Sequence, residues 1–381
     1  MDAAALRRVT ATAQMNIAIA GGGTGGHVNP AVALGHALAS EAVTFVGTAS
    51  GAEASLIPAA GFDLEIIDVK GFDRARPLSL LAVAPRAFGA MLSARRILKR
   101  KEIDVCVGMG GFVSLPVCYA ARSMGIPVVI HEQNIVLGLA NRVSRPLARV
   151  VAVSFEESLD AAGPRAMLVG NPVPPEMAVV DLIAERALGW ERFGLDSTRR
   201  TLLVFGGSQG AHTINQAAVG LARLWADNPD FQVLHVAGPA EAGKVEQEVR
   251  FALEGKRLIY KVVDYVDRMV EAYAVADLAL CRGGATTVAE LCAVGLASVI
   301  IPYPHHRDRQ QQRHASLLES HGACTTISDA DASASAERVA EEVSGLLLDD
   351  FALQQMRKAA LSLGRPDAAL RLADLVRQQA P

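Results

Sequence analysis

One local pattern occurs twice in this chain of 381 residues. An apolar run, a glycine-rich turn and a helix start appear as IAIAGGGTGG at residues 17–26 and again as LLVFGGSQGA at residues 202–211. Each copy is typical of the first strand, turn and helix of a Rossmann-like domain. Because one hydrophobic core rarely serves a chain of this length, the repetition predicts two such domains.

The remainder of the chain continues the same alternation. Short apolar runs, such as residues 105–107, 128–130, 278–280 and 298–301, are separated by Ala/Leu-rich helical stretches. Apolar strands without polar alternation are typical of parallel sheets that helices cover on both faces. The stretch GNPVPPE at residues 170–176 carries three prolines, which interrupt helix and strand alike, and it therefore predicts the boundary between the domains.

Composition excludes several classes of protein. The formal net charge is −3, which argues against broad nucleic-acid binding. The five cysteines form no C-x-x-C pair and are expected to be reduced core thiols. No apolar run approaches the length of a membrane-spanning helix, and the first 14 residues lack the apolar segment of a signal peptide.

The first glycine turn matches G-x-G-x-x-G through Gly21, Gly23 and Gly26. A dinucleotide site also needs an acidic residue at the end of the next strand, but the chain has no acid there until Glu53. The turn therefore either faces a phosphate or a developing negative charge, or serves packing alone. His27 follows at the helix start, where the imidazole stays neutral; it is either a base or a histidine satisfied by local backbone.

The second glycine turn, residues 206–210, also matches the G-x-S-x-G elbow of α/β-hydrolases. A hydrolase would place Ser208 with Asp277 and His305. That interpretation leaves the first glycine turn unexplained, whereas a phosphate-binding role for Ser208 accounts for both turns. A plain turn is the third alternative.

Residues 281–312 carry the densest set of polar groups. Thr286 and Thr287 open a helix after a glycine turn, an arrangement suited to a diphosphate. Glu290, one turn further, could accept hydrogen bonds from two hydroxyl groups of a ribose, or it could form a capping box with Thr287. Asp329 and Asp331 form a D-x-D pair of the kind that some transferases use for a metal, but a Ser/Ala-rich turn produces this pattern easily.

These stretches resemble the MurG family of N-acetylglucosaminyltransferases. The resemblance rests on GGGTGGHVNPAVAL, GGFVSLP, HEQN, GNPV, GGSQGA..IN, CRGGATTVAEL and DRQQ, in this order across nearly the whole chain. It implies a GT-B fold, in which two Rossmann-like, doubly wound α/β domains face a deep cleft. The expected domains are residues 1–172 and 173–356, with a helix at about 357–381 packing back on the first.

The resemblance implies an inverting transfer of N-acetylglucosamine from UDP-N-acetylglucosamine to the C4 hydroxyl of lipid I, without cofactor or metal. A GT-B transferase that uses a UDP-sugar and another lipid or glycoside acceptor remains the alternative. By motif, His27 would be the base, and the main chain at Val266 would read the uracil with Arg282 near it. The other residues implied to contact the donor are Thr24, Gly25, Gly26, Asn134, Ser208, Ala285, Thr286, Thr287, Val288, Ala289, Glu290 and Gln311.

The chain departs from the family pattern in three places. The helix start reads Ala285-Thr286-Thr287, where the family more often has leucine at the middle position. Pro174 stands where the family commonly has an arginine that contacts the donor. The segment before Asp308 is one residue longer than usual, which leaves Gln310, Gln311 and Gln312 open as the sugar contact.

Residues 70–101 mix basic and apolar side chains and suit an anionic membrane surface. The family further implies a peripheral protein on the cytoplasmic face of the cell inner membrane, with cell-wall synthesis and division proteins as possible partners.

Overall fold

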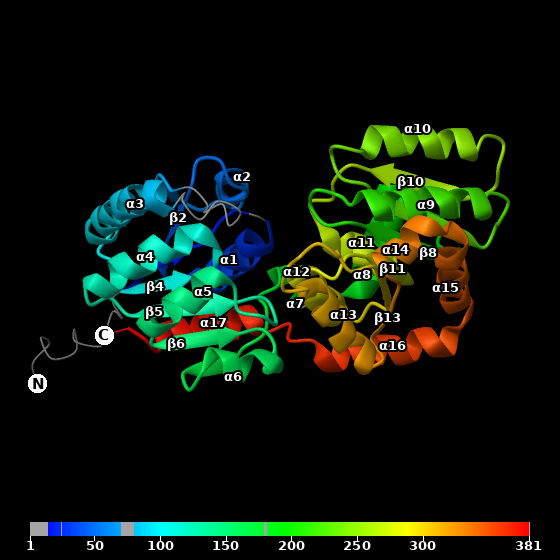
Figure 1. Ribbon diagram of the computed structural model, residues 1–381. Coiled ribbons are helices and arrows are strands. Elements are labelled where there is room, and N and C mark those ends of the chain that lie inside the picture. Colours follow the sequence, from blue (N-terminus) through cyan, green and yellow to red (C-terminus); the bar gives the residue numbers. More distant parts are fainter. Residues whose placement is uncertain (1–13, 24, 70–79, 179–180, 381) are drawn as a thin grey trace, which may run out of the picture. The chain divides into compact units, whose positions relative to one another are not determined.

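The computed structural model describes residues 14–23, 25–69, 80–178 and 181–380. The chain divides into two compact units. Unit 1 comprises residues 1–132, 137–169 and 369–381, and unit 2 comprises residues 133–136 and 170–368. Each unit contains one parallel sheet with helices packed against it (Figure 1).

The sheet of unit 1 has the strand order β3-β2-β1-β4-β5-β6-β7. Because β1 pairs in parallel with both β2 and β4, the strand order reverses beside it, and ligands of doubly wound folds bind at such a reversal. The strands are β1 (Asn16–Ala20), β2 (Ala42–Gly47), β3 (Leu64–Ile66), β4 (Val105–Gly108), β5 (Val128–Glu132), β6 (Val150–Val153) and β7 (Ala166–Leu168).

Strand β1 shows how the sheet of unit 1 is buried on both faces. Ala18 and Ala20 join a core cluster with α3 and α4, whereas Ile17 and Ile19 join a second cluster with α1 and α17. Side chains alternate along a strand, so both faces must be apolar for both clusters to form. The helices of unit 1 are α1 (Gly25–Ala37), α2 (Glu53–Ala59), α3 (Leu80–Arg100), α4 (Gly111–Ser123), α5 (Leu139–Ser144), α6 (Leu159–Ala162) and α17 (Ala368–Arg377).

The sheet of unit 2 repeats this plan, with the strand order β10-β9-β8-β11-β12-β13 reversing beside β8. Its strands are β8 (Arg200–Phe205), β9 (Phe231–Val236), β10 (Ile259–Val263), β11 (Leu278–Cys281), β12 (Ser298–Ile300) and β13 (Cys324–Thr326). Its helices are α7 (Pro175–Ala178), α8 (Leu182–Phe193), α9 (His212–Leu224), α10 (Ala242–Ala252), α11 (Met269–Val275), α12 (Ala285–Val294), α13 (Gln310–Ser320), α14 (Asp329–Ala334), α15 (Ala336–Leu348) and α16 (Asp350–Leu363).

The extent of each unit differs from the boundaries expected from the sequence, 172/173 and about 357. The division falls at 169/170, and residues of unit 1 resume only at 369. Helix α16 stays with unit 2 because Leu361 packs against Gly295, where an added Cβ would lie 2.6 Å from Leu361 Cγ. Arg357 of the same helix also donates to the main-chain oxygen of Asp277 at 3.1 Å.

Two sets of helices differ in how their first turns are capped. Helices α8, α15 and α16 begin at Asp181, Ser335 and Asp349, whose side chains accept hydrogen bonds from main-chain N–H groups. Helices α4, α9 and α12 follow glycine turns and have no side-chain cap. The positive dipole ends of these three helices therefore lie at the strand-order reversals, and their N-cap residues provide no side-chain cap.

Candidate active site

The two glycine turns of unit 2 follow neighbouring strands and lie at the carboxyl ends of these strands, which form one rim of the sheet. Residues 206–210 follow β8, and Gly283 and Gly284 follow β11, its parallel partner. Gly210 must be a glycine, because its φ is +76° and an added Cβ would lie 2.3 Å from the Ala237 oxygen. This close packing holds the turn while Ser208 stays exposed on it.

Helix α12 begins directly at this rim. Gly284 is its N-cap and offers no side chain, and the first bond of the helix runs from Val288 N to Gly284 O. The capping-box alternative for Glu290 is wrong, because Thr287 lies inside the helix rather than at its cap. The segment Ala285–Ala289 thus presents its first turn to this rim, an arrangement that favours bound anions.

Glu290 lies on the buried side of α12. Its Oε2 accepts a hydrogen bond from Tyr273 Oη at 2.7 Å, and the residue is 8% exposed. Burial raises the pKa of Glu290 to about 7, the Tyr273 bond acts in the opposite direction, and the charge of Glu176 adds to the increase. Glu290 is therefore a carboxylate that changes charge near neutral pH.

Two other predicted donor contacts belong to the same unit. Val266 is buried, and the carboxylate of Glu290 helps to raise the pKa of the adjacent Tyr265, after burial and Asp267, so this segment and Glu290 lie within electrostatic reach. Arg282 is also buried, but it donates to Ile301 O at 3.0 Å and pairs with Asp329. The Arg282 guanidinium thus ties together loops of this rim.

Asn134 belongs to the short segment 133–136 of unit 2, although the residues on either side of that segment, Glu132 and Leu137, belong to unit 1. The segment 133–136 is attached by Ile135 N, which donates to Nε2 of His314 at 3.3 Å, and by Val136 O, which accepts from Gln310 Nε2 at 3.2 Å. His314 in turn bonds to Gly283 O through Nδ1 at 2.9 Å, so it is neutral with Nδ1 protonated. Sequence reasoning did not single out His314, since no motif distinguishes a connecting histidine.

The three open glutamines differ in their contacts. The side-chain nitrogen of Gln310 donates hydrogen bonds to Val136 O and to the carboxylate of Asp308. Gln311 accepts from Tyr303 N at 3.0 Å through its side-chain oxygen, and Gln312 is exposed. Gln311 is therefore the one of the three whose oxygen is fixed by the main chain after β12.

Unit 1 brings its own two glycine turns together at the end of β1 and β4. Gly111 has φ +75°, and an added Cβ would lie 2.4 Å from Gly22 O. The ring of half-buried His27 lies against Gly110, whose added Cβ would be 3.0 Å from His27 Cδ2. Burial lowers the pKa of His27 and the Glu53 carboxylate opposes this, so the ring is neutral at neutral pH.

Three residues of the first glycine turn directly precede His27. Gly25 starts α1 and Gly26 is exposed, whereas Thr24 lies outside the described residues. The four residues of the HEQN stretch, 131–134, belong to different units. Glu132 is in unit 1, where its carboxylate accepts hydrogen bonds from Gly138 N and Asn141 Nδ2, both at 2.8 Å. The acid of this stretch therefore caps a loop, while its asparagine, Asn134, lies in unit 2.

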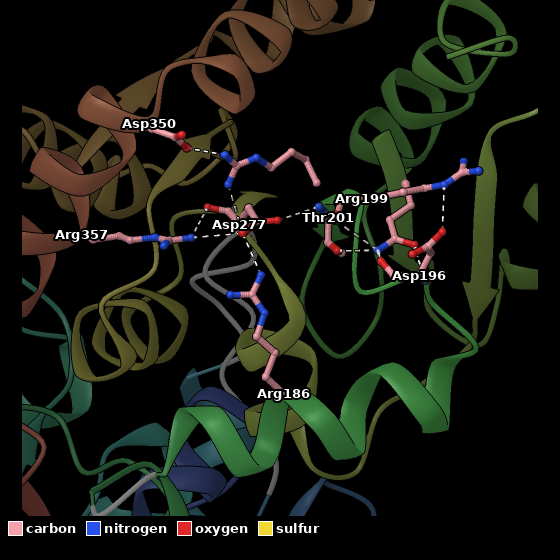
Figure 2. Close-up of polar contacts among 9 residues, drawn as sticks. Arg186, Asp196, Arg199, Thr201, Asp277, Asp350 and Arg357 are labelled. Atoms are coloured by element: carbon pink, nitrogen blue, oxygen red, sulfur yellow. Dashed lines mark hydrogen bonds and ion pairs between the residues drawn. The ribbon is translucent and has the colours of Figure 1, made fainter. Parts of the chain in front are cut away.

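The hydrolase alternative is wrong because Asp277 and Ser208 lie at opposite ends of the strands: Asp277 at the amino ends and Ser208 at the carboxyl ends. Asp277 precedes β11 and accepts from Thr201 N, at the start of β8, at 2.9 Å, whereas Ser208 follows the end of β8. A strand of this length separates the two by roughly 20 Å. Figure 2 shows Asp277 enclosed instead by Arg186 and Arg357, with Arg186 Nη2 at 2.8 Å.

The D-x-D pair also has local partners. Asp329 pairs with Arg282, and Asp331 accepts from Ser328 Oγ at 2.7 Å. Within the described part of the chain, no group of three or more His, Cys, Asp or Glu side chains is arranged to hold a metal ion.

Comparison with known proteins identifies the family. The glycosyltransferase family 28 N-terminal domain matches residues 17–153, and the family 28 C-terminal domain matches residues 201–372. The UDP-N-acetylglucosamine--N-acetylmuramyl-(pentapeptide) pyrophosphoryl-undecaprenol N-acetylglucosamine transferase of Acidothermus cellulolyticus is 41% identical over 376 residues, covering 96% of this chain and 98% of that one. The chain belongs to the MurG family.

Two further comparisons agree. The same-named transferase of Mycobacterium avium is 39% identical over 379 residues, covering 97% of this chain and 90% of that one. The crystal structure of Acinetobacter baumannii MurG superposes with a TM-score of 0.73 at 26% identity, covering 96% of this chain and 99% of that one. The predicted GT-B fold, with two doubly wound Rossmann-like sheets, is confirmed.

Proposed function

We propose that this chain transfers N-acetylglucosamine from UDP-N-acetylglucosamine to the C4 hydroxyl of the N-acetylmuramyl residue of lipid I, giving lipid II for peptidoglycan synthesis. The observation that carries the proposal is the pairing of an uncapped helix start with a buried carboxylate at one rim of the sheet: Gly284 begins α12, and Glu290 lies one turn and a half further. The names of the relatives supply the two substrates.

The donor would bind to unit 2. The first turns of α9 and α12 would hold the diphosphate, with Ser208 and Thr286 as hydroxyl contacts, since helix starts favour anions. Ionised Glu290 would accept hydrogen bonds from the two ribose hydroxyls. The main chain at Val266 would form hydrogen bonds with the uracil. Asn134 and Gln311 would contact the N-acetylglucosamine.

The transfer would be a direct displacement. The acceptor oxygen attacks the anomeric carbon as the bond to the diphosphate breaks, so the α-linked donor gives a β-linked product. Negative charge grows on the departing diphosphate, and the N–H groups at the starts of α9 and α12 would stabilise it. The proton of the acceptor hydroxyl would pass to the neutral imidazole of His27.

We also infer that the chain binds peripherally to the cytoplasmic face of the inner membrane, where its acceptor would be anchored. Of the described helices, none combines the length and apolar character needed to cross a bilayer. Phe88 and Leu92 of α3 are 59% and 38% exposed, and Arg96 and Lys99 of the same helix are also exposed. A surface of basic and apolar side chains can bind anionic lipid.

The decisive experiment is a transfer assay. The full chain is incubated with radiolabelled UDP-N-acetylglucosamine and a lipid I analogue, with EDTA present, and a labelled disaccharide-lipid is expected. The Acidothermus relative serves as the positive control, and a glycoside acceptor without the lipid diphosphate tests the alternative transferase. Failure of transfer to the lipid I analogue, while the relative is active under the same conditions, would refute the proposal.

A further inference from the structure

A buried carboxylate lies directly beneath the first glycine turn. Glu53, the first residue of α2, is fully buried, and three glycines make room for it. An added Cβ at Gly22 would lie 2.4 Å from Glu53 Oε1, one at Gly51 would lie 2.1 Å from Oε2, and one at Gly47 would lie 2.7 Å from Cγ. The backbone around this carboxylate is therefore closed to any side chain larger than hydrogen.

The carboxylate is fully engaged with the turn. Gly23 N donates to Glu53 Oε2 at 2.9 Å, while Thr48 donates to Oε1 from its main-chain N at 3.0 Å and from its Oγ1 at 2.7 Å. Burial acts to raise the pKa of Glu53, but these bonds outweigh it and bring the pKa below its usual value. Glu53 is therefore a permanent anion at neutral pH.

This arrangement changes what the first turn can bind. In a dinucleotide-binding turn, main-chain N–H groups donate to a phosphate. Here a carboxylate of the chain itself takes the N–H of Gly23, and its charge would repel a phosphate brought to that position. The same G-x-G-x-x-G pattern thus forms a turn without an open phosphate site at Gly23.

The charge of Glu53 also acts on His27, because α2 packs against α1. Its field raises the pKa of the His27 ring against the effect of burial. The other groups around the ring come from different elements: Gly110 lies against it, and Asn141 of α5 lies next to Gly110, with its side chain bonded to Glu132 of β5. Asn141 is neutral, and Glu132 is a second carboxylate behind it.

We propose that Glu53 is a positioning residue of the transfer reaction, whose fixed negative charge holds the first glycine turn, excludes phosphate from it and keeps His27 able to take up a proton. The inference rests on the proposed function for the role of His27 as base. The interaction of Glu53 with His27 does not depend on that role, and it can be measured without substrate.

The first test follows the His27 ring by NMR during a pH titration of the full chain. Glu53→Gln removes the charge with little change in size, and the pKa of His27 should fall by about half a pH unit or more. Glu53→Asp keeps the charge and should leave the pKa close to that of the wild type. Glu65→Gln is the matched control, since Glu65 pairs with Arg100 and Lys101 at the edge strand β3. An unchanged His27 titration in Glu53→Gln would overturn the proposal.

The second test uses transfer kinetics. In Glu53→Gln, kcat should fall several-fold and the acidic limb of its pH profile should move to lower pH, because His27 becomes a weaker base. The affinity for UDP should not change, since the residues proposed to hold its diphosphate, ribose and uracil lie in unit 2. A wild-type pH profile would overturn the proposal. Wild-type kcat in His27→Gln would instead remove the base from the proposed function and leave the NMR result standing.

Phosphate exclusion has its own measurement. With unit 2 saturated by UDP, inorganic pyrophosphate should leave the His27 resonance of the wild type unmoved. In Glu53→Ala, which opens the N–H groups of Gly23 and Thr48, pyrophosphate should shift that resonance. A shift in the wild type, or none in Glu53→Ala while that variant keeps wild-type UDP affinity, would show that the carboxylate does not close the turn.

Discussion

Replacing Glu290 with glutamine should make unit 2 more stable and weaken its binding of UDP. In the folded protein burial raises the pKa of Glu290 from 4.5 to about 7. The stabilising contribution of the neutral carboxyl is therefore complete below pH 4.5 and is lost as the pH rises through about 7. At about 1.4 kcal/mol per pH unit, the loss approaches 3 kcal/mol at pH 8 as an upper limit.

Glutamine is neutral throughout and can still accept from Tyr273. Glu290→Gln should therefore match the wild type near pH 4 and exceed its free energy of unfolding by up to about 3 kcal/mol at pH 8. Urea unfolding followed by tryptophan fluorescence measures this selectively, because both tryptophans, Trp190 and Trp225, belong to unit 2.

The same substitution should weaken UDP binding roughly 10- to 100-fold above pH 7, since one amide oxygen replaces a carboxylate that accepts two hydroxyl groups. Wild-type affinity should also fall as the pH drops below about 7, whereas the affinity of the variant should be nearly flat. Calorimetric titration with UDP from pH 5 to pH 8 measures both effects.

Glu271→Gln provides a control with the opposite sign. Glu271 is also buried and lies on neighbouring α11, but it pairs with Arg192 at 2.7 Å and Arg268 at 2.6 Å. Its loss should destabilise unit 2. The reasoning fails if Glu290→Gln is less stable than the wild type at pH 8, or if it binds UDP with wild-type affinity.

Three other substitutions test separate parts of the structure. Asp277→Ala should lower the free energy of unfolding of unit 2 by about 1–3 kcal/mol, because the buried N–H of Thr201 loses its acceptor and half-exposed Arg186 and Arg357 lose their ion-pair partner; UDP affinity should be unchanged, and a variant of wild-type stability would contradict this. Gly111→Ala should reduce kcat more than tenfold without changing UDP affinity, since its Cβ would lie 2.4 Å from a carbonyl oxygen of the first glycine turn. Gly125→Ala, at a similar positive φ with no atom within 4 Å of its Cβ, is the control and should keep wild-type turnover. Arg96→Glu combined with Lys99→Glu should release the chain from anionic vesicles, and retained binding would place the membrane contact elsewhere.

Most strands could be predicted closely from the sequence, whereas three short edge strands could not. The apolar runs 105–107 and 128–130 lie within β4 and β5, whose residues are buried along their whole length. Strands β3, β7 and β13 were missed. Each has three residues and lies at an edge of its sheet, so at least one face lacks the continuous apolar pattern.

The site could be predicted where a motif places a side chain next to its own turn. Glu290 follows the turn at Gly284 by six positions on the same helix, so its place near that turn follows from the local sequence. Glu53 and His314 act on turns about 30 residues away in sequence, through contacts that only the folded chain creates. Their roles could not be predicted, since neither residue belongs to a local pattern that names its partner.

The placement of α17 determines the order in which unit 1 can fold during synthesis. Leu372, Ala373 and Val376 cover the face of the first sheet that Ile17 and Phe45 also line, and Figure 1 shows this helix, in red, beside β6. A nascent chain that has already produced all seven strands of unit 1 still exposes that apolar face while the whole of unit 2 is made. Unit 1 therefore needs protection from aggregation on the ribosome until the α17 segment has left the exit tunnel.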